Sequence, residues 1–98
     1  MAFKLTWSPS ARFDIKNIAD FIADDRPSVA GRFVKSLFRV VERLADFPES
    51  GRMVPEIADS NIREVIRKPY RLIYRIDRTK RTVEIVRVWH AARGTPAV

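Results

Sequence analysis

The chain has 98 residues, 46% hydrophobic and 32% charged, which suits one folded domain over residues 1–98 and excludes an intrinsically disordered protein. With no cysteine and one histidine, it has no disulfide, no thiolate nucleophile and no metal site built from cysteines or from several histidines. The formal net charge is +7, and residues 51–98 carry 11 Lys and Arg against 5 Asp and Glu. This surplus either attracts polyanions or an acidic protein, or only solvates the surface.

The first residues predict a short strand without a targeting signal. Phe3, Leu5 and Trp7 alternate with polar residues, the pattern of a half-buried strand. The N-terminus lacks the apolar core of a signal peptide, and charged residues interrupt every stretch long enough to span a bilayer. We therefore expect a cytoplasmic protein with no membrane partner.

Two helices are predicted next. Ser8 is a typical N-cap residue, and Pro9 suits the first helical position because a proline there loses no hydrogen bond. Apolar residues recur at spacings of three and four up to Ile22, and the helix must end before Pro27. A second amphipathic helix runs from Pro27 to about residue 47. The short connection between the two predicts an antiparallel helical hairpin.

Residues 48–61 hold two prolines, a glycine and scattered charges, and they predict a loop. Three segments rich in β-branched and aromatic residues follow, at 62–66, 70–76 and 81–90, and they predict a three-stranded meander. The element order is therefore β-α-α-β-β-β. It predicts an α+β fold in which the helical hairpin packs on one face of a largely antiparallel four-stranded sheet.

A symmetric turn at residues 77–80 sets the expected register of the last two strands, with Leu72 opposite Ile85 and Tyr74 opposite Val83. These residues are expected to face the helices, together with Ile76 and Trp89. An extra residue in either strand would exchange the two faces. The face away from the helices is expected to hold eight residues: Arg71, Ile73, Arg75, Thr82, Glu84, Val86, Val88 and His90.

This second face is a candidate binding surface, because it combines arginines and the lone histidine with apolar side chains. The alternative is a solvated face on which Arg71 and Arg75 pair with Glu84. Phe13 is a further candidate, since it lies on the first helix away from the apolar stripe. It either anchors a partner or is covered by residues 48–61 or by the C-terminal tail. No phosphate-binding loop, metal-ligand spacing or nucleophile motif occurs, so we expect no cofactor and no metal.

Five segments together resemble the RelE/ParE superfamily of bacterial toxins, and the resemblance spans residues 3–93. They are residues 5–11 (LTWSPSA), 44–52 (LADFPESGR), 62–64 (IRE), 70–76 (YRLIYRI) and 86–90 (VRVWH). The resemblance implies a toxin of a type II toxin–antitoxin system. It also implies a cognate ParD-like antitoxin, a ribbon-helix-helix dimer that binds operator DNA and wraps the toxin with an acidic C-terminal segment. The toxin would then contact operator DNA only through the antitoxin.

The superfamily has two activities, and the residues bear on both. ParE-like toxins bind DNA gyrase and inhibit it without chemistry of their own, whereas RelE-like toxins cut mRNA on the ribosome. In the RelE-like alternative Arg71 and His90 match residues of the nuclease site, and Glu64 or Glu56 could supply a carboxylate. Ala91 and Ala92 follow His90 where many of the nucleases have a tyrosine, and this ending favours the ParE-like function.

The surface expected to contact target and antitoxin comprises nine residues. They are Phe13, Arg71, Ile73, Arg75, Val86, Val88, Trp89, His90 and Arg93.

Overall fold

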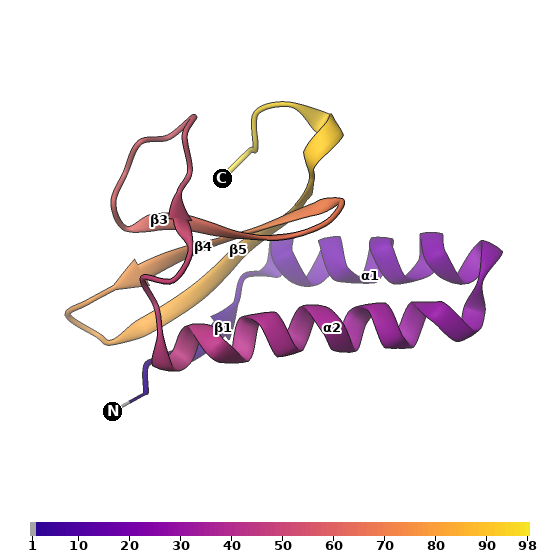
Figure 1. The fold of residues 1–98 in the computed structure, drawn as a ribbon, viewed down its shortest axis with the longest axis horizontal. Coiled ribbons are helices and arrows are strands. Elements are labelled where there is room, and N and C mark those ends of the chain that lie inside the picture. The colour runs from indigo at the N-terminus through magenta and orange to yellow at the C-terminus, as the bar shows by residue number, and fades with distance from the viewer. Residues whose placement is uncertain (1) are drawn as a thin grey trace.

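Two antiparallel helices cover one face of a five-stranded sheet in the computed structural model, which describes residues 2–98 (Figure 1). The sheet order is β1-β5-β4-β3-β2, in which β1 runs parallel to β5 and all other pairs are antiparallel. In chain order the elements are β1 (Lys4–Trp7), α1 (Pro9–Asp25), α2 (Pro27–Asp46), β2 (Arg52–Met53), β3 (Ile62–Arg67), β4 (Tyr70–Asp77), β5 (Thr82–His90) and the 3₁₀ turn η1 (Ala91–Arg93).

The helices begin and end at the predicted residues. Ser8 caps α1, since its Oγ accepts a hydrogen bond from the Ala11 N–H at 3.0 Å, and Pro9 occupies the first turn. Arg26 leaves the helical conformation before Pro27, which opens α2. The described part of the chain contains no helix long and apolar enough to cross a membrane.

The predicted α+β fold is confirmed, but the number of strands was wrong. Residues 48–61 are not all loop, because Arg52 and Met53 pair with Glu64 and Arg63 at the edge of the sheet. Prolines at 48 and 55 confine this pairing to two residues, and a strand that short leaves no alternating pattern in the sequence.

The predicted register of β4 and β5 was wrong by two residues near the turn and was further changed by a bulge. Tyr74 lies opposite Ile85, whereas Ile73 lies opposite Arg87, so Val86 is an extra residue in β5. Up to Ile85 the predicted faces hold. Beyond Val86 they are exchanged, because one inserted residue reverses the side of every residue that follows.

Because of this exchange, three side chains lie on the face opposite to the one predicted. Val88 packs in the core beneath the helices, and His90 lies opposite Tyr70, another residue of that core. Trp89, predicted to face the helices, lies on the opposite face. Arg71, directly across from Trp89, shares that opposite face.

The face away from the helices is not open at its centre, contrary to the prediction. Val54 and Ile57 of the segment between β2 and β3 pack against it and form a second small core with residues of the sheet. The sheet residues of this core are Ile62, Ile73, Val86 and Trp89. The C-terminal tail is held beside it, because the carbonyl of Gly94 accepts a hydrogen bond from Trp89 Nε1 at 3.2 Å.

Candidate functional site

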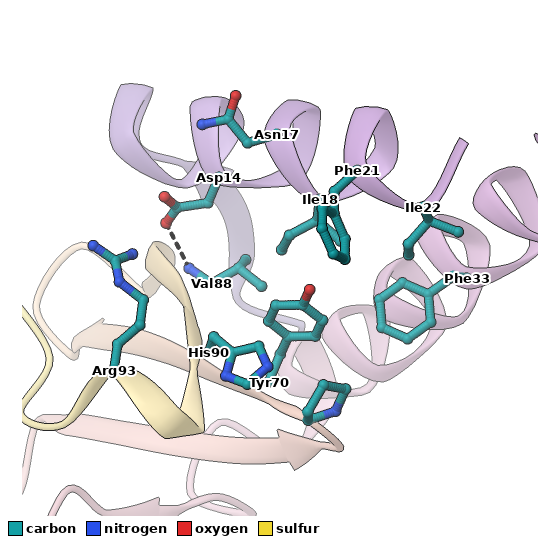
Figure 2. A pocket seen from close by; sticks show the side chains of 11 residues that line it. Asp14, Asn17, Ile18, Phe21, Ile22, Phe33, Tyr70, Val88, His90 and Arg93 are labelled. Carbon is teal, nitrogen blue, oxygen red and sulfur yellow. Dashed lines mark hydrogen bonds between the residues drawn. The ribbon is translucent and has the colours of Figure 1, made fainter. Parts of the chain in front are cut away.

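An apolar groove with a volume of about 590 Å³ lies between α1 and the C-terminal end of β5 (Figure 2). Its apolar lining comes from both layers of the fold, since α1, α2, β4 with the preceding Pro69, and β5 all contribute. These residues are Ile18, Phe21, Ile22, Phe33, Pro69, Tyr70 and Val88. Polar side chains stand at its margin: Asp14, Asn17, His90 and Arg93. We call this feature the α1–β5 groove.

The groove exists because β1 is shorter than β5. After Trp7 the chain leaves the sheet to begin α1, so the last residues of β5 pair with β4 on one side and have no strand on the other. Asp14 replaces that strand: it accepts the Val88 N–H at 2.9 Å and holds the Arg87 guanidinium at 2.8 and 2.9 Å. These hydrogen bonds raise the pKa of Arg87. The helix is thereby fixed above β5 with an apolar space between them.

His90 and Arg93 stand at the sheet side of the groove in fixed positions. His90 Nδ1 accepts the Ala92 N–H at 3.0 Å and so caps η1, while its ring packs edge-on against Tyr70 with 5.3 Å between centroids. The Arg93 guanidinium lies 3.8 Å from the centroid of the Trp89 ring. Burial raises the pKa of Tyr70, which keeps its hydroxyl neutral. The groove therefore presents apolar side chains to a ligand, with the positively charged Arg93 at its margin.

Two exposed aromatic side chains extend the apolar surface along α1. Phe13 is 64% exposed and Phe21 is 75% exposed. With Asn17 they are spaced by four residues and so lie along one side of the helix. Of the two alternatives for Phe13, cover by residues 48–61 or by the tail is wrong, because its side chain is exposed.

An ionic cluster with a buried centre, Arg71 and Glu64, lies on the opposite face of the sheet. Arg71 donates to Glu64 at 2.6 Å and makes two hydrogen bonds of 2.8 Å with Glu56. Arg52 donates to the second oxygen of Glu64 at 2.6 Å. Hydrogen bonds from Arg71 lower the pKa of Glu56 to about 2, and the two carboxylates raise the pKa of Arg71. Two cations thus face two anions, and this cluster is balanced in charge.

Of the four residues named for RNA cleavage, Arg71, Glu64 and Glu56 lie together, but His90 is separated from them. Glu64 and Arg71 bind each other, whereas His90 lies on the other face of the sheet beside Tyr70. The expectation that Arg71 and His90 share a face was wrong, because the bulge at Val86 reverses the end of β5.

The other residues predicted to contact the target and the antitoxin form a buried group and an exposed group. Ile73, Val86, Val88 and Trp89 are buried in the two cores, while Arg93 is exposed. Arg75 is exposed and pairs with Glu84 at 3.2 Å, which is the solvated arrangement considered as the alternative. Within residues 2–98, no group of three or more His, Asp or Glu side chains is arranged to hold a metal ion.

The family model of the ParE toxin of the type II toxin–antitoxin system parDE matches residues 5–94. The chain belongs to the ParE toxin family. It is therefore a toxin of a type II toxin–antitoxin system. This ParE-family chain is 34% identical to toxin RelE2 of Caulobacter vibrioides over 91 residues, which is 92% of this chain and 97% of that protein.

Solved structures have the same fold. A chromosomal ParDE system from P. aeruginosa superposes with a TM-score of 0.74 and 21% identity, covering 91% of this chain and 96% of that one. A RelBE2 toxin–antitoxin complex from Mycobacterium tuberculosis superposes with a TM-score of 0.68 and 24% identity, covering 92% and 99%. ParE and RelE toxins thus share the architecture, and the fold does not distinguish their targets.

The sequence analysis missed most of the groove. Asp14, Asn17 and Phe21 lie on α1, and the only signal in the sequence is the spacing of four residues that places Asn17 and Phe21 on the same side of the helix as Phe13. Phe33 and Tyr70 carry no signal of a groove in the sequence, because the gap above them arises only when α1 and β5 are placed together.

Proposed function

We propose that this ParE-family toxin inhibits DNA gyrase by binding to it and that a ParD-like antitoxin neutralises it. The observation that carries the first part is the separation of Arg71 and His90 onto opposite faces of the sheet. Cleavage of RNA needs a base, an acid and a cation around one phosphate. Here Arg71 already binds two carboxylates and His90 caps η1, so neither is positioned to act on an RNA phosphate. The arrangement therefore favours a toxin that binds its target over one that cleaves RNA.

The α1–β5 groove is the proposed site of the antitoxin. Its apolar lining with Arg93 and His90 at the margin suits an amphipathic segment with acidic residues, which is the chemistry expected of the antitoxin's C-terminal region. Exposed Phe21 at the rim adds an aromatic anchor of the kind that dominates interfaces. A solved relative of this fold is a toxin–antitoxin complex.

The gyrase part is tested in a supercoiling assay with the purified toxin, with and without its antitoxin, read for relaxed and cleaved plasmid. We expect inhibition that the antitoxin relieves and that His90→Gln leaves unchanged. Absence of inhibition at micromolar toxin would contradict the proposal. So would cleavage of mRNA on ribosomes that His90→Gln slows by about 10²–10⁴-fold, the range of an acid–base group.

The antitoxin part is tested by titrating the antitoxin onto groove variants. Phe21→Ser removes an anchor at the groove, and Phe47→Ser removes a similarly exposed phenylalanine that does not line it. We expect Phe21→Ser to weaken binding at least about tenfold, as a hot-spot aromatic does, and Phe47→Ser to leave it unchanged. Equal affinities for both variants would place the antitoxin elsewhere.

A further inference from the structure

Four cationic side chains form a stripe along the outer side of α2: Arg32, Lys35, Arg39 and Arg43. At 100° and 1.5 Å per residue they fall within an arc of about 80° and span about 16 Å of helix. All four are exposed, and none lines the α1–β5 groove. Helix α2 lies along the lower margin of the molecule in Figure 1. We call these residues the α2 stripe.

Half of the Lys and Arg side chains that make no ion pair, hydrogen bond or ring contact within residues 2–98 belong to the α2 stripe. Of the 19 Lys and Arg, 11 have side chains in ion pairs, hydrogen bonds or ring contacts. Across residues 2–98 the other eight make no such contact, and four of the eight are the α2 stripe. The remaining four are spread over the molecule: Lys4, Arg12, Lys68 and Lys80. Residues 51–98, despite their surplus of charge, contribute only two of the eight.

The stripe acts against the stability of its own helix. Lys35 and Arg39 are four residues apart, as are Arg39 and Arg43, and like charges at this spacing repel. Glu42 and Asp46 follow Arg39 and Arg43 by three residues, a spacing at which opposite charges attract, so they offset part of this repulsion without forming an ion pair in the described residues. The four cations still outnumber the two anions, and an external anion would relieve the repulsion that remains.

We propose that the α2 stripe binds the phosphate backbone of duplex DNA without reading its sequence. Each strand of B-DNA carries a phosphate every 3.4 Å of axis, so about 16 Å of duplex holds about five phosphates on each strand, and the two strands together offer more phosphates than the four cations need. This binding is distinct from inhibition of gyrase and from neutralisation by an antitoxin. The α2 stripe is separate from the α1–β5 groove, and its partner is a nucleic acid rather than a protein.

The neighbouring side chains favour duplex DNA over RNA. Single strands are held by several exposed aromatic rings, whereas two of the three phenylalanines on or beside α2 have ring partners: Phe33 packs on Tyr70, and Phe38 packs on Trp7. Phe47, at the end of the helix, is exposed, and one ring does not make a stacking surface for successive bases. RNA duplexes are recognised largely through the 2′-hydroxyl. The hydroxyl of Ser36 donates to the Phe33 carbonyl and accepts from Arg67, so it is already used within the protein.

The test measures binding of the full-length toxin to a fluorescent 20-base-pair DNA duplex of mixed sequence between 50 and 200 mM KCl. Four phosphate contacts predict a slope of log K against log salt of about −3.6, or about a 150-fold loss over this range. Arg39→Gln with Arg43→Gln should halve the slope, leaving about a 12-fold loss. The matched control, Arg12→Gln with Lys80→Gln, also lowers the net charge from +7 to +5 and should keep the full slope.

Three results would overturn the proposal. They are absence of binding at 50 mM KCl, equal loss of slope in the two double variants, and tighter binding of an RNA duplex of the same length. Equal loss would mean that only net charge matters. Glutamine has a helix propensity close to that of arginine, so far-UV circular dichroism is expected to be the same for both variants and wild type.

Discussion

Replacing Arg71 with methionine is expected to destabilise the protein by about 3–5 kcal/mol, the cost of leaving a buried charge without its partner. The Glu64 side chain is fully buried, and Arg71 and Arg52 each approach it at 2.6 Å. Without Arg71 it keeps only Arg52, which is 61% exposed and screened by water. A domain of this size loses about 4–8 °C of melting temperature per kcal/mol, so the fall should be at least about 12 °C.

Urea unfolding followed by circular dichroism at pH 7 measures this loss. The double variant Arg71→Met with Glu64→Leu removes both charges and should lose less than the sum of the two single variants, by up to about 3 kcal/mol. Arg75→Met is the control, because its pair with Glu84 is exposed and should be worth less than about 1 kcal/mol. A loss below about 1 kcal/mol for Arg71→Met, or strict additivity, would refute the buried-charge reasoning.

Three further predictions concern pH, capping and packing. Because Arg71 lowers the pKa of Glu56 from 4.5 to about 2, the stability advantage of wild type over Glu56→Gln should be full above pH 4.5 and vanish toward pH 2 in urea unfolding; a constant difference would contradict it. Ser8→Ala removes the α1 cap and should cost about 1–2 kcal/mol by calorimetry, whereas an unchanged melting temperature would show that the cap contributes nothing. Gly51→Ala places a Cβ 2.5 Å from a β3 carbonyl oxygen and should destabilise the protein by about 1–3 kcal/mol. The Cβ of Gly31→Ala meets nothing within 4 Å, and this change should stabilise the protein by about 1 kcal/mol. Thermal unfolding in which both variants shift the melting temperature in the same direction would refute this contrast.

Local signals in the sequence were sufficient for both helices, for four of the five strands and for their order. The Ser8–Pro9 start of α1 and the break before Pro27 depend on backbone chemistry within a few residues. The apolar stripes of the helices and the β-rich segments likewise report which side is buried. These features predicted two helices on a sheet, and the five segments resembling RelE/ParE toxins agree with the family match.

The sequence carried no signal for the bulge at Val86, and this one residue decides which side chains meet. It moves His90 to the helix side of the sheet and Trp89 to the side of Arg71. A bulge depends on how two strands pair and where β1 leaves the sheet, not on the residue types within β5. The site expected from alternation was therefore divided between two faces.

The distribution of charge was also decided by tertiary contacts. Composition located the basic character of the protein in residues 51–98, but folding pairs Arg52 and Arg71 with Glu64 and Glu56, and Arg87 with Asp14. Counting charges along a chain says nothing about which of them find partners far away in sequence. The electrostatic field near a surface comes largely from the charges that remain unpaired there, and half of the unpaired Lys and Arg side chains of residues 2–98 lie on α2.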